Sequence, residues 1–84
     1  MLRILYFAWL RDRLGRSGET VSLSAGVDSV ADLISQLRAR GGAYAEVFAR
    51  PELIRVAVNQ SFATNAATIA ANDEIAFFPP VTGG

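Results

Sequence analysis

Apolar positions in the first third of the chain follow the patterns of β-strands. Residues 2–8 form a continuous run of branched and aromatic side chains, which predicts a strand buried on both faces and central in its sheet. Residues 19–24 alternate polar with mostly apolar positions, which is typical of a half-exposed second strand. Between them, polar residues 11–13 with Gly15 and Gly18 indicate a connection. The chain is therefore expected to open with two strands.

The next segment has the period of a helix. Apolar residues recur at i, i+3, i+4 and i+7, at Val30, Leu33, Ile34 and Leu37. This spacing places one apolar stripe toward a sheet. Residues 29–32 have the form of a capping box, Arg38 suits the negative end of the helix dipole, and Gly41 suits a C-cap. A short helical turn over residues 43–48, ended by Pro51, is expected to follow.

The second half of the chain predicts two more strands. Residues 53–58 form the first of them, and Asn59 with Gln60 forms the turn after it. Residues 72–73 are another turn signal, and residues 74–78 form a last strand that Pro79 terminates. The expected order is strand, strand, helix, strand, strand. This order predicts an α+β fold in which a mixed sheet packs on one main helix.

A chain of 84 residues with 51% hydrophobic residues is long enough for one compact core and too short for two. We therefore expect a single domain over residues 1–84, with an extended tail over residues 79–84. The apolar run near the N-terminus is brief and stops at charged residues, which argues against a signal peptide. With no stretch as long as a membrane span, we expect a cytoplasmic protein.

The composition narrows the chemistry further, because lysine, cysteine and histidine are all missing and eight arginines balance eight acidic residues. Disulfides, thiol catalysis, the usual zinc sites and the commonest general base are thereby excluded. Nucleic acid is not an expected partner, because the chain has no net basic field. The glycines lack the strand-glycine-helix context of a phosphate-binding loop, so we expect no cofactor bound by this chain.

Few side chains are left as catalytic candidates. Asp73 and Glu74 are neighbours on an expected strand and point to opposite faces, so they cannot flank one reacting bond. A turn-and-cap role suits this pair better. The cluster at residues 11–13 is interpreted as a solvated turn, with a partner contact kept open for Arg11.

The C-terminal residues, from Pro79 to Gly84, are unlike the rest of the chain. A final Gly-Gly arises by chance in roughly one chain in two hundred, and alone it is also compatible with a frayed end. The preceding strand anchors the segment, Pro79 and Pro80 keep it extended, and the last four residues span at most about 14 Å. Without Cβ atoms, the glycines fit a narrow tunnel. The sequence therefore predicts a carrier whose terminal carboxyl is activated by an ATP-using partner and then receives sulfur or is joined to an amine.

Three sequence blocks extend this hypothesis, because they resemble a known family. They are Leu5-Tyr6-Phe7-Ala8 with Arg11 and Leu14-Gly15, then Ala57-Val58-Asn59-Gln60, and above all the stretch from Asp73 to Gly84. Nearly the whole chain resembles the small, sulfur-carrying subunit of molybdopterin synthase, a ubiquitin-like β-grasp protein. One departure is Asn72, where the family more often has glycine; asparagine tolerates a positive φ well enough to keep the turn.

The resemblance implies a non-catalytic role in molybdenum cofactor biosynthesis. An E1-like adenylating enzyme would activate Gly84 with ATP, a sulfur donor protein would supply the sulfur, and a thiocarboxylate would form. The tail, Pro80, Val81, Thr82 and Gly83 included, would enter the large synthase subunit and donate sulfur to cyclic pyranopterin monophosphate. Two small subunits would flank a dimer of large ones, forming a heterotetramer.

The expected partner surface and two alternatives complete the sequence-based hypotheses. Strand alternation turns Ile75 and Phe77 toward the helix and Phe78 away from it, which makes Phe78 an expected partner anchor and Phe62 a second contact. One alternative is a thiazole-type sulfur carrier or a ubiquitin-like protein modifier. Another is a β-grasp interaction module whose tail has no chemistry.

Overall fold

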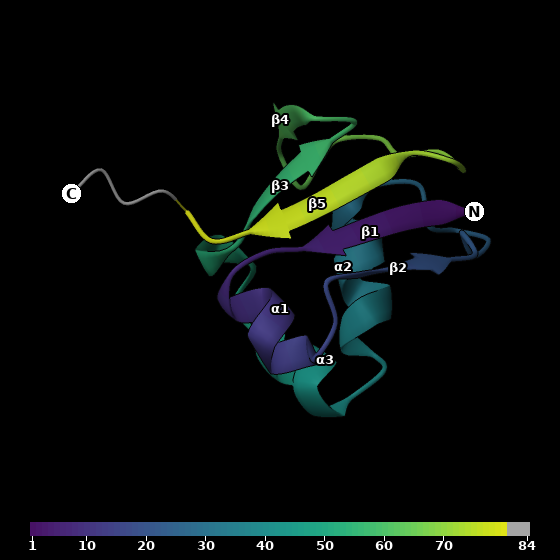
Figure 1. The fold of residues 1–84 in the computed structure, drawn as a ribbon. Helices are drawn as coiled ribbons and strands as arrows, with labels where there is room; N and C mark the ends of the chain where they lie inside the picture. Colours follow the sequence, from purple (N-terminus) through teal and green to yellow (C-terminus); the bar gives the residue numbers. More distant parts are fainter. Residues whose placement is uncertain (81–84) are drawn as a thin grey trace.

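The computed structural model describes residues 1–80, and these residues form one sheet with helices on one side of it (Figure 1). The strands are β1 (Leu2–Tyr6), β2 (Gly18–Val21), β3 (Arg55–Val58), β4 (Ser61–Ala63) and β5 (Glu74–Phe78). The helices are α1 (Trp9–Leu14), α2 (Val30–Arg38), α3 (Gly42–Val47) and a 3₁₀ turn, η1 (Pro51–Leu53). No helix in this described part is long and apolar enough to cross a bilayer.

The sheet is mixed and has the strand order β2-β1-β5-β3-β4. Strands β1 and β5 run parallel at its centre, whereas the β1–β2, β3–β5 and β3–β4 pairs are antiparallel. Helix α2 crosses one face, and α1 and α3 lie beside it (Figure 1). The arrangement is an α+β, ubiquitin-like β-grasp, which confirms the fold class predicted from the sequence.

Helix α2 forms for the reasons that its sequence indicates. The Ser29 hydroxyl accepts a hydrogen bond of 3.2 Å from the Asp32 backbone N–H, which caps the first turn. The four residues of the predicted apolar stripe are all buried against the sheet. With the buried residues of β1, β3 and β5, they form one continuous core, which includes the aromatic rings of Tyr6, Phe48 and Phe77.

Two tight turns at the far end of the sheet depend on asparagines with left-handed backbones. Asn59 and Gln60, which join β3 to β4, have φ values of 51° and 70°, and Asn72 before β5 has a φ of 73°. The Asn59 side chain donates to Asp73 at 3.0 Å and accepts from the Glu74 backbone N–H at 2.9 Å. Asp73 therefore has the turn role expected for it, and the turn forms with Asn72 in a left-handed conformation, as expected.

Three predictions about elements were wrong. Strand β1 lies inside the sheet between β2 and β5, as predicted, but it is buried on one face only, because helices cover a single side of the sheet. The expected connection after β1 contains the helix α1. A fifth strand, β4, was also missed; it has three residues, too few for a clear alternation.

Candidate functional site

The end of β5 is the feature on which the tail hypothesis depends. This strand lies between β1 and β3, and it delivers Pro79 and Pro80, the last described residues, to the surface at one end of the sheet (Figure 1). Proline has no amide hydrogen to donate to a ladder, which accounts for the end of the strand at Phe78. The predicted tail residues Val81, Thr82, Gly83 and Gly84 lie outside the described residues.

The face of the sheet opposite α2 carries the aromatic residues that were expected to bind a partner. Ile75 and Phe77 are fully buried on the helix side, whereas Ala76 and Phe78 are half-buried on the other side, as strand alternation predicted. Phe62 is 85% exposed, and its ring centroid lies 5.8 Å from that of Phe78. An exposed aromatic ring in contact with a half-buried one is characteristic of a binding surface.

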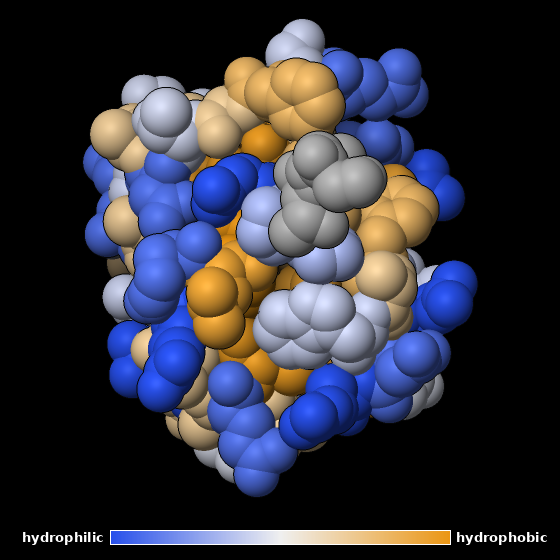
Figure 2. Space-filling view, turned by 90° about the vertical axis from the view of Figure 1, so that its left-hand side faces the viewer, coloured by the Kyte–Doolittle hydropathy of each residue, from blue (hydrophilic) through white to orange (hydrophobic). Residues whose placement is uncertain are grey.

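Further apolar side chains gather where the sheet ends, and sequence reasoning did not identify them. Phe7, Trp9 and Leu53 are 46%, 37% and 47% exposed. The Phe7 backbone N–H donates to the Phe77 carbonyl at 3.1 Å, which fixes the Phe7 backbone beside the end of β5. Figure 2 looks at this end of the molecule and shows apolar surface between strongly hydrophilic side chains. The chain after Phe78 thus leaves the domain at a partly apolar face.

The residue between Phe7 and Trp9 has a strained backbone that determines the direction of the chain. Ala8 has φ 56° and ψ −131°, a conformation that residues with a Cβ rarely adopt. It precedes α1 and carries no capping side chain. Such strain costs on the order of 1–3 kcal/mol and persists only where surrounding contacts impose it. Here it turns the chain sharply from Phe7 into the helix that begins at Trp9.

Arg11, the third expected interface residue, lies on α1 at the same end of the molecule. Its side chain is 53% exposed, and its Nε lies 3.6 Å from Asp12 Oδ1. An exposed pair of this kind contributes little to stability. The guanidinium therefore has most of its hydrogen-bonding capacity available for a partner.

Glu19 of β2 is the centre of a hydrogen-bond network that the sequence did not reveal. Its carboxylate accepts from Tyr6 at 2.8 Å, Tyr44 at 2.6 Å, Arg40 at 2.8 Å and Arg16 at 3.3 Å. Burial opposes its ionisation, but the hydrogen bonds from Tyr44, Arg40 and Tyr6 outweigh burial and lower the pKa of Glu19 below the usual 4.5. The network ties the edge strand to α3 and to the end of α2, so its role is structural.

Replacing this carboxylate is expected to make stability less dependent on pH. Glu19→Gln should lower the free energy of unfolding by about 2 kcal/mol at neutral pH, because charge-assisted hydrogen bonds are lost. The folded pKa lies below the unfolded one, so the stabilisation is present above about pH 4.5 and is lost as pH falls through the folded pKa. Urea unfolding over a pH series should show the two proteins converging in acid. Glu46→Gln, at an exposed carboxylate outside the network, is the control, and a difference that stayed constant in acid would contradict this account.

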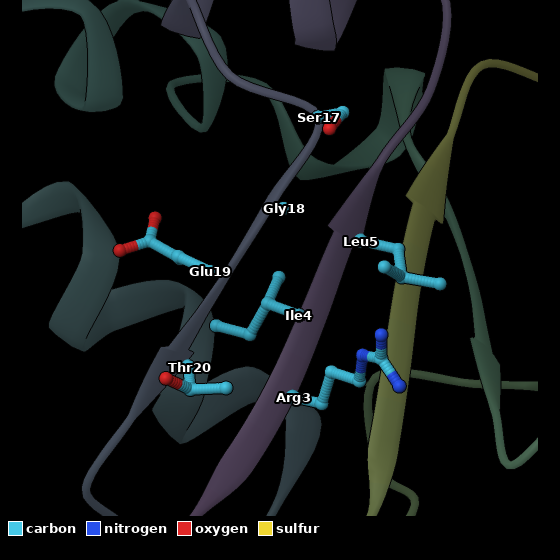
Figure 3. A pocket seen from close by; sticks show the side chains of 7 residues that line it. All are labelled: Arg3, Ile4, Leu5, Ser17, Gly18, Glu19 and Thr20. Atoms are coloured by element: carbon cyan, nitrogen blue, oxygen red, sulfur yellow. The ribbon is translucent and has the colours of Figure 1, made fainter.

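The depression beside Glu19 does not form an active site. It has a volume of about 400 Å³ and lies along β1 and β2, with Gly18 in its wall. A Cβ on Gly18 would lie 2.7 Å from the Ile4 carbonyl oxygen, so glycine keeps the two strands close there. Figure 3 shows Arg3 and Glu19 projecting to opposite sides of these strands, so the two charges cannot act on one ligand. Within residues 1–80, no carboxylate cluster is close enough to hold a metal ion.

Sequence relatives match the chain from end to end. A family model described as the ThiS family matches residues 4–84. Two curated proteins named "Molybdopterin synthase sulfur carrier subunit", from Haemophilus influenzae and Escherichia coli, are 33% and 32% identical, and each match covers 100% of both chains. The matched region includes the tail residues and the interface residues predicted from the sequence.

Solved structures share the fold. A crystal structure of SAMP1 from Haloferax volcanii is 31% identical with a TM-score of 0.76, over 99% of this chain and 98% of that one. A second crystal structure from that organism, of small archaeal modifier protein 1, is 28% identical with a TM-score of 0.74, over 95% and 97%. A complex of subunits 1 and 2 of the molybdopterin-converting factor from Helicobacter pylori contains a chain with a TM-score of 0.66, over 99% and 97%. At 17% identity, that likeness concerns the fold alone.

Proposed function

This chain belongs to the ThiS family, and on that premise we propose that it is the sulfur carrier subunit of a molybdopterin synthase. The observation that carries the proposal is the end-to-end match to two curated sulfur carrier subunits of the same length. The fold supports it, because the central strand leads the chain out of the domain beside exposed aromatic side chains. The chain serves as a carrier in molybdenum cofactor biosynthesis.

The chemistry takes place at the carboxyl group of Gly84. A carboxylate is a poor electrophile, so an adenylating enzyme first joins it to AMP from ATP and releases pyrophosphate. Sulfur at the sulfide level from a donor protein then displaces AMP and leaves a thiocarboxylate. In the large synthase subunit, this sulfur passes to cyclic pyranopterin monophosphate, and water restores the carboxylate at Gly84. The chain itself binds no cofactor and contributes no catalytic side chain; ATP is consumed by the activating enzyme.

The partners follow from this chemistry. The large synthase subunit accepts the tail through residues Pro80, Val81, Thr82 and Gly83, and it docks on Phe78, Phe62 and Arg11. The E1-like adenylating enzyme and the sulfur donor protein are the other partners. We place the protein in the cytoplasm, where it forms a heterotetramer with a dimer of large subunits.

A ubiquitin-like protein modifier is the second candidate function. The similarity to SAMP1 and to small archaeal modifier protein 1 from Haloferax volcanii favours it, because a modifier also requires an activated terminal carboxyl. The two functions differ in what attacks the adenylate. Sulfur gives a thiocarboxylate, whereas a lysine amine of another protein gives an amide.

Intact-mass analysis tests the proposal directly. After incubation with the adenylating enzyme, ATP and a sulfur source, the chain should show one oxygen replaced by sulfur, located at Gly84 by fragmentation. The chain has no cysteine to carry a persulfide, so no side-chain thiol can mimic this result. Samples without ATP or without the sulfur source should keep the unmodified mass, as should a matched variant that lacks Gly84. A dominant amide adduct with another protein would favour the modifier instead.

A further inference from the structure

Charge is distributed unevenly over this protein, although its formal net charge is zero. One end, here called the acid end, carries Asp28, Asp32, Asp73 and Glu74, with Arg3 as the arginine among them. The opposite end, at which β5 finishes, is here called the tail end. It carries most of the remaining arginines, namely Arg11, Arg13, Arg50 and Arg55.

The sheet register and the helix packing place these groups. Glu74 begins β5 and pairs with Arg3, while Phe78 ends it and pairs with Arg55. Strand β1 runs parallel to β5, so α1, which follows β1, lies at the tail end. Arg50 immediately precedes η1, which Figure 1 shows beside the end of β5. The acid end includes the start of α2, because the Ile69 backbone N–H donates to the Asp28 carbonyl at 3.0 Å.

Most arginines at the tail end are not neutralised by a neighbour. Within the described residues, the ion pairs join Arg16 and Arg40 to Glu19, and Arg11 to Asp12. Among residues 1–80, Arg13 and Arg50 have no carboxylate within ion-pair distance, and neither has Arg55, whose Nη1 donates to the Glu52 carbonyl at 3.2 Å. Three carboxylates, Asp12, Glu46 and Glu52, lie on the same side of the molecule, so the four arginines leave a small excess of positive charge there.

We propose that the tail end is a basic docking face, and that the large synthase subunit carries acidic residues around the entrance through which it accepts the tail. The inference rests on the proposed function. Figure 2 shows strongly hydrophilic side chains around an apolar centre at this end, and the arginines named above are exposed, which matches the usual anatomy of an interface with a charged rim. The rim charges orient the approach of the tail, and the apolar centre supplies affinity.

The basic docking face should raise the rate at which the chain associates with the large synthase subunit. At physiological ionic strength, charges are screened over about 8 Å, so a molecule with no net charge is steered mainly by the charges nearest the contact. Complementary rim charges raise association rates by about 10-fold or more at low salt and change dissociation less. A partner with an acidic entrance would therefore select the tail-first orientation.

The test compares two variants with the same net charge. Arg50→Gln combined with Arg55→Gln removes two positive charges from the tail end. Ala31→Glu combined with Ala71→Glu adds two negative charges at exposed positions of the acid end. Both have a formal charge of two units below wild type and leave the tail unchanged. Association with the isolated large synthase subunit is followed by stopped flow at several salt concentrations, after thermal melts confirm that both variants fold.

The arginine variant should associate about 10-fold more slowly at low salt, and the difference should shrink as salt is added. The acid-end control should associate at the wild-type rate. Equal slowing of both variants, or no slowing of either, would overturn the basic docking face while leaving the proposed function intact. Failure of the wild-type chain to bind the large subunit at any salt concentration would overturn the proposed function, and this inference with it.

Discussion

Phe78→Ser is expected to abolish tight binding to the large synthase subunit while the domain stays folded. The ring is half-buried on the open face of the sheet, and among the aromatic rings of residues 1–80 it contacts that of Phe62, which is exposed. Loss of a central aromatic anchor costs about 2 kcal/mol or more of binding free energy, which is roughly a 30-fold or larger rise in Kd. The loss of stability should be about 1 kcal/mol, a fall in Tm of about 4–8 °C for a domain of this size.

The neighbouring residue offers a matched control. Phe77 has the same side chain on the same strand but is fully buried, where it packs against the rings of Tyr6 and Phe48. Phe77→Ser should cost about 3–5 kcal/mol, as large-to-small changes in a core do, and should unfold much of the population. Isothermal titration and thermal melting should therefore separate the two variants. A collapse of folding in Phe78→Ser, with unchanged binding by the folded fraction, would show that the binding face is assigned to the wrong side of the sheet.

Strand β5 and helix α2 could be predicted from the sequence because local rules and burial agree there. Residues 74–78 favour a strand and their burial alternates along it, and Pro79 removes any means of continuing the ladder. Helix α2 has a side-chain cap at Ser29 and a full apolar stripe. Both elements lie in the centre of the fold, where tertiary contacts reinforce the intrinsic preference.

Helix α1 was not predicted because its formation depends on contacts that are distant in sequence. It is six residues long, has no capping side chain, and buries Leu10 as its one fully covered residue. Its sequence, rich in charge, also suits a solvated turn. The Glu19 network was missed for a related reason: its donors come from β1, α3 and two loops, and only the folded sheet brings them to one carboxylate.

The tail could be interpreted from the sequence because its chemistry is a matter of composition. Small side chains and a terminal carboxyl are visible without any tertiary structure, and the Pro-Pro pair predicts an extended exit. The surrounding surface could be identified only in part. Phe78 follows from strand alternation, whereas Phe7, Trp9 and Leu53 come near the end of β5 only through the path that Ala8 and η1 impose.

The second large effect is expected at Gly83, where a Cβ should obstruct a tunnel that fits glycine. Gly83→Val should abolish sulfur transfer to the pterin precursor, because the branched side chain blocks passage of the carboxyl to the catalytic centre. The free energy of unfolding should be unchanged within error, since the substitution lies beyond the described core. The measurements are molybdopterin formation with purified large subunit and thiocarboxylated carrier, and a thermal melt of each variant.

Two further variants make this result interpretable. Gly83→Ala adds a single methyl group and should retain intermediate activity if the passage is limited in width. One glycine added after Gly84 should abolish transfer, because it displaces the reactive carboxyl. One glycine added before Met1 is the matched control, and it should leave transfer intact.

The step at which Gly83→Val fails would locate the narrow passage. Normal thiocarboxylation followed by failure in the synthase reaction would place it in the large subunit, and failure at thiocarboxylation would place it in the adenylating enzyme. Full molybdopterin synthesis by the chain extended after Gly84 would contradict the carrier function itself and favour an interaction module whose tail has no chemistry.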